Sequence, residues 1–243
     1  MYRIFVVILS AMLFAATTSA QSKFSLGADF VSSYMWRGVA VAGTSIQPSM
    51  NFTTGGFSIA AWGSVDITGS GYKEVDLSLA YSINGFSIGL SDNWWSGEGA
   101  FDYFNFKKDL CSHYLEVNLG YEFDFGLHLA WNTIISGAGD KYTEFTDDAG
   151  KPKRAFSSYF ETGYSFSIQD VKLTAALGFT PWNSTVMYTG TYPHATDGFA
   201  VNNISLKASK DIAVTDKFSL PVFGQLAFNP ATEDAFLIFG ISF

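Results

Sequence analysis

The chain has 243 residues and is acidic, with 14 Lys and Arg against 22 Asp and Glu and a formal net charge of −8 at pH 7. Because no basic run or stripe offsets this acidity, the composition argues against a nucleic-acid partner. Charged residues make up only 15% of the chain and aromatic residues 17%, whereas a water-soluble domain carries about a quarter of its residues as charged ones. This departure favours a surface in contact with lipid.

The first 20 residues have the pattern of a secretory signal peptide. Arg3 gives a positive start, residues 4–16 form an apolar run, and Thr18-Ser19-Ala20 is a small-residue cleavage site. That run is too short for a membrane helix of about 20 residues. We therefore expect an exported protein, cleaved after Ala20, with one domain at residues 21–243. Cys111 is the only cysteine, so no disulfide framework is expected.

The rest of the chain alternates apolar and polar residues in short stretches, which is the period of a β-strand with one apolar face. Glycine-containing turns such as Thr54-Gly55-Gly56 and Asn84-Gly85 separate several of these stretches. We expect about twelve strands, within a range of ten to fourteen, at residues 24–36, 46–53, 57–67, 74–82, 86–92, 114–123, 127–135, 156–166, 171–179, 203–208, 218–229 and 235–243.

Connections after the even-numbered strands are short, and most of those after the odd-numbered strands are longer. Transmembrane barrels show this asymmetry, with short periplasmic turns and long outer loops. The sequence therefore predicts an all-β fold, a transmembrane antiparallel up-and-down β-barrel in the Gram-negative outer membrane, with both termini in the periplasm. Aromatic residues at the strand ends predict two girdles at the lipid interface. Tyr34 and Trp36 are expected on the outward face, Trp36 as part of the outer girdle.

The last strand predicts how the barrel closes. Leu237, Phe239, Ile241 and Phe243 share one face, and the final residue is aromatic. A membrane barrel pairs its last strand with its first, because an open edge would leave polar backbone groups in hydrocarbon. We expect the outer-membrane lipid to contact this face and the barrel-assembly machinery to bind the strand through Phe243.

The segment Asp29-Phe-Val-Ser-Ser-Tyr-Met-Trp-Arg-Gly38 resembles the opening motif of the TorF-type porin family. Ile46-Gln-Pro-Ser49 and Ala61-Trp-Gly-Ser64 extend the similarity, which covers roughly residues 24–125. Met35 departs from the pattern, since another aromatic or aliphatic residue often stands there. The resemblance implies an outer-membrane barrel of porin type and brings no catalytic residue and no defined substrate.

The inward-facing positions of the expected barrel are rich in acids. Most acids fall on the fourth to eighth strands and the bases on the ninth, tenth and first, which predicts opposite arcs of charge. Arg37 is expected to pair with an acid such as Asp29 or Asp66 rather than to bind a ligand. A lumen lined by acids favours cations, although the same charges could form salt bridges that only fill the barrel. The predicted pore-lining residues are Arg37, Asp66, Glu74, Asp76, Glu116, Glu161 and Lys207.

Twelve strands should enclose a narrow pore. The function predicted first is a porin-like channel for passive diffusion of ions or small polar solutes, with a mild preference for cations. One alternative is a plugged barrel with a structural or adhesive role. Another is an outer-membrane enzyme such as a lipid hydrolase, suggested by Ser112 beside His113, although no serine–histidine–asparagine arrangement is legible.

Two loops carry further expectations. The aromatic stretch at residues 93–112 is open to three arrangements. The two preferred ones are that it folds inward as a constriction or lies at the lipid interface; the third is that it stacks on sugar-like solutes. The loop with Glu144, Asp147 and Asp148 is acidic, but its spacing differs from that of a calcium-binding EF-hand loop. The three histidines are scattered along the chain. We therefore expect neither a metal nor a cofactor.

Overall fold

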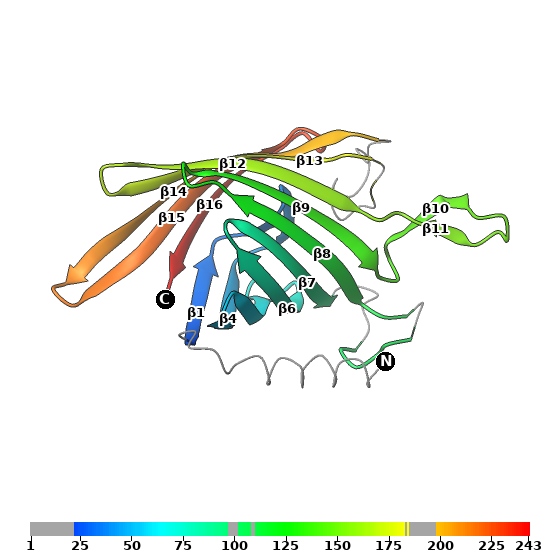
Figure 1. The fold of residues 1–243 in the computed structure, drawn as a ribbon, viewed down its shortest axis with the longest axis horizontal. Coiled ribbons are helices and arrows are strands. Elements are labelled where there is room, and N and C mark those ends of the chain that lie inside the picture. Colours follow the sequence, from blue (N-terminus) through cyan, green and yellow to red (C-terminus); the bar gives the residue numbers. More distant parts are fainter. Residues whose placement is uncertain (1–21, 97–101, 108–109, 183, 185–197) are drawn as a thin grey trace.

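The computed structural model describes residues 22–96, 102–107, 110–182, 184 and 198–243. The predicted signal peptide lies outside these ranges. Twelve antiparallel strands form one closed barrel, which confirms the predicted fold class (Figure 1). The barrel strands are β1 (Lys23–Val31), β4 (Ser45–Thr54), β5 (Phe57–Asp66), β6 (Lys73–Ile83), β7 (Phe86–Ser96), β8 (His113–Glu122), β9 (Leu127–Ser136), β12 (Ser158–Ile168), β13 (Val171–Thr180), β14 (Ala200–Thr215), β15 (Phe218–Asn229) and β16 (Asp234–Ser242).

Each barrel strand pairs with its neighbours along the chain, apart from two short hairpins that leave the wall. One hairpin joins β2 (Tyr34–Trp36) to β3 (Val39–Ala42), and the other joins β10 (Lys141–Thr146) to β11 (Pro152–Arg154). Figure 1 shows β10 and β11 extending away from one rim of the barrel. Within the described ranges, no helix is long and apolar enough to cross a membrane.

The barrel closes where β16 meets β1, and this joint is short. Its register runs only from Asp29 opposite Ser242 to Val31 opposite Gly240, whereas β1 pairs with β4 along its whole length, from Lys23 to Val31. Backbone hydrogen bonds between Ala28 and Phe243 end the joint. The part of β1 before Ala28 is therefore paired with β4 but not with β16, because it extends past the end of β16.

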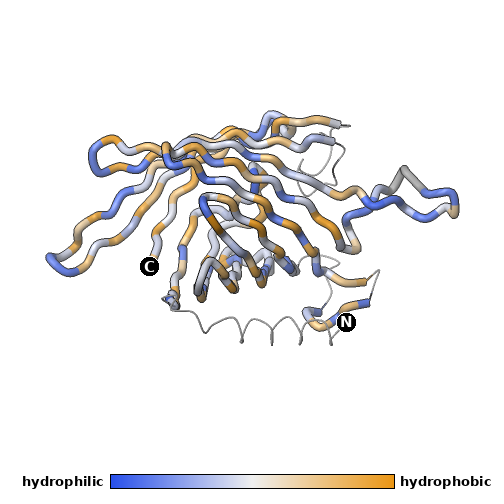
Figure 2. The backbone as a smooth tube through the Cα atoms, in the orientation of Figure 1, coloured by the Kyte–Doolittle hydropathy of each residue, from blue (hydrophilic) through white to orange (hydrophobic). Residues whose placement is uncertain are grey.

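Alternation along the strands separates an apolar outside from a polar inside, as the sequence predicts. Outward residues of three strands are well exposed, for example Leu26 at 68%, Leu77 at 45% and Leu237 at 63%. Inward residues such as Ser64 and Asn203 are buried. Figure 2 shows the same alternation of hydrophobic and hydrophilic residues along the tube. The lumen, rather than the outer wall, is where polar chemistry is possible.

Strand boundaries differ most from the predicted ones in three places. The first strand ends at Val31, β7 continues to Ser96, and β14 spans Ala200–Thr215. The pairing of β13 with β14 stops where Lys172 lies opposite Ser209. Strands β14 and β15 stay paired up to Thr215 and Phe218, so the tip of their hairpin extends beyond β13. At the base of this overhang the Lys210 ammonium lies 2.9 Å from an oxygen of Asp170.

The first strand ends early because the chain bends at Ser32 and Ser33, and a tight turn at Arg37 and Gly38 then reverses it. Both turn residues have positive φ angles, 52° and 80°, and Trp36 pairs with Val39 across them. Two consecutive positive φ angles define a type I′ turn, which joins strands of a hairpin with the correct twist. The chain therefore folds back at this point instead of continuing up the wall.

Candidate functional site

The β2–β3 hairpin lies inside the barrel. The Tyr34 side chain is buried, and its ring centroid lies 5.4 Å from that of Trp62 on β5. The Trp36 ring lies 6.2 Å from Trp95 on β7. Both aromatic residues were expected on the outward face, and that expectation is wrong because the chain bends at Ser32 and Ser33 and leaves the wall before it reaches them.

The tip of the hairpin touches the wall formed by β14 and β15. The Asn229 side-chain amide donates a hydrogen bond of 3.0 Å to the Gly38 carbonyl oxygen. A Cβ atom on Gly38 would lie 1.8 Å from the carbonyl oxygen of Asn202. Glycine is therefore required at this position for two reasons: the positive φ angle and the close approach of the wall.

Arg37 connects this tip to the far side of the lumen. Its guanidinium donates two hydrogen bonds to the carboxylate of Glu116 on β8, at 2.6 and 2.8 Å. Both side chains are well shielded, with 13% and 3% of their surfaces exposed. The guanidinium carbon also lies 4.5 Å from the ring centroid of Trp36 and 5.1 Å from that of Tyr159. This bidentate geometry holds the hairpin across the barrel.

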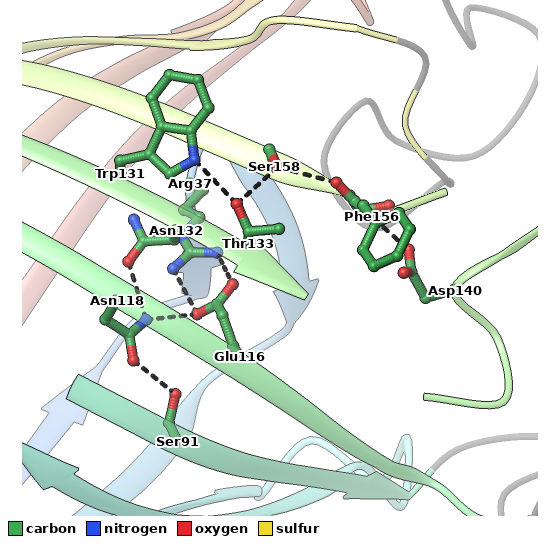
Figure 3. A network of polar contacts seen from close by, with 11 residues as sticks. Arg37, Ser91, Glu116, Asn118, Trp131, Asn132, Thr133, Asp140, Phe156 and Ser158 are labelled. Carbon is green, nitrogen blue, oxygen red and sulfur yellow. Dashed lines mark hydrogen bonds and ion pairs between the residues drawn. The ribbon is translucent and has the colours of Figure 1, made fainter. Parts of the chain in front are cut away.

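A chain of polar contacts extends the anchor along the wall (Figure 3). The Asn118 amide donates to Glu116 and to Asn132, both at 2.9 Å. The Ser91 hydroxyl donates to the Asn118 carbonyl oxygen at 3.0 Å. Strands β7, β8 and β9 thus contribute one residue or more each to the support of a single ion pair.

Arg37 therefore pairs with an acid, as expected, but the acid is Glu116 and neither of the two named examples, Asp29 and Asp66. Sequence position placed Arg37 on the first strand, but the turn moves it across the lumen to the arc that carries the acids. Asp66 instead accepts hydrogen bonds from the backbone of Gly43, at 2.9 Å, and of Thr68, at 2.7 Å. It holds two outer connections together.

The other predicted pore-lining residues fall into two groups. Glu74 accepts a hydrogen bond of 2.6 Å from the Tyr72 hydroxyl. Glu161 accepts from the Tyr159 hydroxyl and, at 3.2 Å, from the Asn203 amide. Asp76 and Lys207 belong to the second group, because they line one hollow inside the barrel. Glu74, besides its hydrogen bond, lines another.

The hairpin separates two hollows. One, of about 320 Å³, is lined by strand residues that include Asp29, Asp76 and Lys207. The other, of about 170 Å³, lies against Tyr72, Glu74 and Trp95. Tyr34 and Trp36 line both of them. The hairpin is therefore the partition between them. Its only local signs in the sequence are the break in alternation at Ser32-Ser33 and the Arg-Gly pair.

The described part of the aromatic loop, residues 102–107, lies against the outside of the barrel. His113 contacts Asp92 at 3.0 Å, and both residues share the outward face with Leu90 and Leu115. The Phe106 ring stacks on His113 with centroids 4.7 Å apart. Of the two arrangements preferred for this loop, the position at the lipid interface fits these contacts, and the constriction comes from the first connection instead.

No group of three or more His, Cys, Asp or Glu side chains in the described ranges could hold a metal ion. Glu144 of the acidic loop has a side chain outside what the structure describes. Its neighbour Asp147 accepts backbone hydrogen bonds from Ala149 at 2.9 Å and Lys151 at 2.8 Å. This carboxylate therefore closes its own turn.

Asp140, which lies outside the barrel wall, should make the stability of the protein depend on pH. Its side chain has no exposed surface, and burial raises the pKa of this carboxyl above its ordinary value of 3.8, against the opposing hydrogen bonds from Ser157. The folded chain therefore binds this proton more tightly than the unfolded chain. The contribution of Asp140 to the free energy of unfolding is therefore fully present at acidic pH, and it is lost as the pH rises through the raised pKa.

We expect Asp140→Asn to raise the free energy of unfolding at neutral and alkaline pH, because the buried charge is gone. The gain should shrink as the pH falls toward 3.8. Urea titrations of both proteins over this pH range measure it. A gain of equal size at every pH would contradict the role assigned to the charge.

No protein-family model matches the chain, and no curated protein matches it either. Membership in the TorF-type family therefore stays a prediction. Among solved structures, a porin is similar at 14% identity and a TM-score of 0.41, over 83% of this chain and 62% of that one. A mutant porin of Rh. blastica follows at 10% identity and a TM-score of 0.38, over 82% and 55%.

The translocator domain of the autotransporter NalP from Neisseria meningitidis matches over 99% of this chain and 94% of that one, at 11% identity and a TM-score of 0.31. The chain thus spans less than two thirds of either porin. At these identities and TM-scores the likenesses carry no inference about activity. The barrel is established by the strand pairing of the chain itself.

Proposed function

We propose that this protein is an outer-membrane channel for ions or small polar solutes, with both termini in the periplasm. One observation carries the proposal: a closed barrel with an apolar outer wall encloses a polar lumen that contains hollows of about 320 and 170 Å³. Closed barrels are one of the two structures that satisfy all backbone groups in hydrocarbon. An exposed wall of leucine, isoleucine and phenylalanine is stable there and costly in water.

Adjacent residues of β6 test whether the wall faces lipid. Leu77 points outward and is 45% exposed, and Ser78 is the next residue, on the lumenal face. We expect Leu77→Arg to lower the free energy of unfolding in lipid vesicles by about 2–4 kcal/mol, the cost of arginine near a bilayer midplane. Ser78→Arg is the matched control and should cost much less. Equal costs would argue against a lipid-facing wall.

We further propose a mild preference for cations. Arg37 neutralises Glu116, so this acid contributes little to the field along the passage. Asp29 and Asp76 line the larger hollow with Lys207 as the basic residue there, so acidic side chains outnumber basic ones by one. Reversal potentials in a salt gradient across a planar bilayer measure the preference. Selectivity for anions would overturn it, and Asp76→Asn should weaken the selectivity for cations.

A plugged barrel with a structural or adhesive role is the second candidate. The observation that favours it is the hairpin, which is held across the lumen by Arg37 and Glu116. The same bilayer recordings separate the two functions, because a permanently plugged barrel conducts no measurable current. Assembly through Phe243 by the barrel-assembly machinery belongs to both proposals, and removing this residue should reduce the amount of barrel inserted in the membrane.

A further inference from the structure

We infer that the larger hollow under the hairpin is a binding site for a small organic cation, a compound with an ammonium group and a short apolar body. The inference names a class of solute for the proposed channel and rests on that function only for the route by which the solute would arrive. The walls of this hollow combine carboxylates with aromatic rings around a space of about 320 Å³. This volume lies at the lower end of the size range of small-molecule sites.

The polar groups of the hollow favour a positive ligand. Asp76 has one carboxylate oxygen that is buried and has no hydrogen-bond partner in the part of the chain that the structure describes. A buried acceptor without a donor costs free energy, so a ligand that donates a hydrogen bond or carries positive charge would be stabilised there. Asp29 lines the same hollow.

The basic groups nearby leave this carboxylate available. The Lys207 ammonium lies over the Phe223 ring, 3.8 Å from its centroid. Arg37 is engaged by Glu116 on the far side of the hairpin. An anionic ligand would meet two carboxylates for one ammonium, which disfavours it electrostatically.

Aromatic rings supply the second half of the site. Tyr34, Trp36 and Trp62 line the hollow, and the Tyr34 and Trp62 rings meet at 56° with their centroids 5.4 Å apart. Ring faces attract cations, most strongly those of tryptophan, and apolar rings also pack against methyl and methylene groups. An inorganic ion would use the carboxylates alone, whereas an organic ammonium uses both kinds of wall.

Tryptophan fluorescence of the purified protein in detergent micelles tests the inference. The probes are choline and its neutral analogue 3,3-dimethylbutan-1-ol (dimethylbutanol), in which a carbon atom replaces the charged nitrogen. We expect a saturable change with choline that sodium chloride at equal ionic strength does not reproduce. Trp62→Phe should reduce the amplitude of this change. Saturation by dimethylbutanol at the same concentrations would overturn the inference, because the hollow would then recognise an apolar shape only.

Asp76→Asn keeps the size of the side chain and removes its charge. We expect it to weaken choline binding about tenfold or more, because the quaternary ammonium, which has no N–H to donate, loses its Coulombic attraction to the carboxylate. Glu122→Gln is the matched control, since Glu122 is an exposed acid at the turn end of β8, and its affinity should equal that of the unchanged protein. An unchanged affinity in Asp76→Asn overturns the site.

The comparison of choline with dimethylbutanol needs no variant, so it decides the question even if Asp76→Asn does not fold. Fluorescence in micelles also separates this inference from the channel itself. Saturable choline binding by a barrel that carries no current would refute only the channel. Current through a barrel that shows no saturable binding would refute only the binding site.

Discussion

Replacing residues 34–42 by a short glycine–serine linker should raise the single-channel conductance several-fold. These residues form the β2–β3 hairpin that separates the two hollows of the lumen. The deletion leaves β1 and β4 intact, because β1 ends at Val31 and β4 begins at Ser45. With the partition gone, the hollows should merge into one wider passage.

Single-channel recordings in planar bilayers give the measurement. The matched control is a similar shortening of the β10–β11 hairpin, which lies at a rim and outside the barrel (Figure 1), and it should leave the conductance unchanged. If the deletion of residues 34–42 has no effect on the current, the conducting path does not pass the hairpin. If the barrel still carries no current after the deletion, the result would support the plugged alternative, with another part of the protein blocking the lumen.

Removal of either partner of the Arg37–Glu116 pair should destabilise the barrel strongly. Both side chains are shielded from water, and breaking a buried ion pair leaves one uncompensated charge, at a cost of about 3–5 kcal/mol. We expect losses of this order in the free energy of unfolding for Arg37→Ala and for Glu116→Ala. The double variant should lose less than the sum of the two, since no isolated charge remains.

Equilibrium unfolding by urea in lipid vesicles yields all terms of this double-mutant cycle. Asp170→Asn is the control for an exposed ion pair, because the Asp170–Lys210 pair lies at the surface, and this change should leave the free energy of unfolding almost unaltered. Additive losses from Arg37→Ala and Glu116→Ala would show that the two groups do not stabilise each other.

The barrel was predictable from the sequence because its signal is local. A period of two, turns such as Asn84-Gly85 and the alternation of short and long connections each report on neighbouring residues. The same rules placed most inward and outward side chains correctly, among them Glu116, Asp76 and Lys207. For these residues the wall itself fixes the direction of the side chain.

The hairpin escaped prediction because its position depends on distant residues. Arg37 precedes Gly38 where asparagine or aspartate would have been the familiar sign of a type I′ turn. Its ion-pair partner is 79 residues away, and no local pattern distinguishes Glu116 from Asp66 as that partner. Alternation tells which side of a wall a residue faces, but it does not tell which connection returns into the lumen.

The short joint between β1 and β16 also sets how the barrel comes apart. Only the stretch from Asp29 to Val31 is in register there. Bonds between Ala28 and Phe243 lie at one end of it and bonds between Ser32 and Phe239 at the other, so fewer bonds must break than along any seam in which whole strands are paired. Under denaturant or mechanical tension, rupture should begin at this junction. The cylinder would then unroll as a curved sheet, with its amide protons exchanging first along β1 and β16.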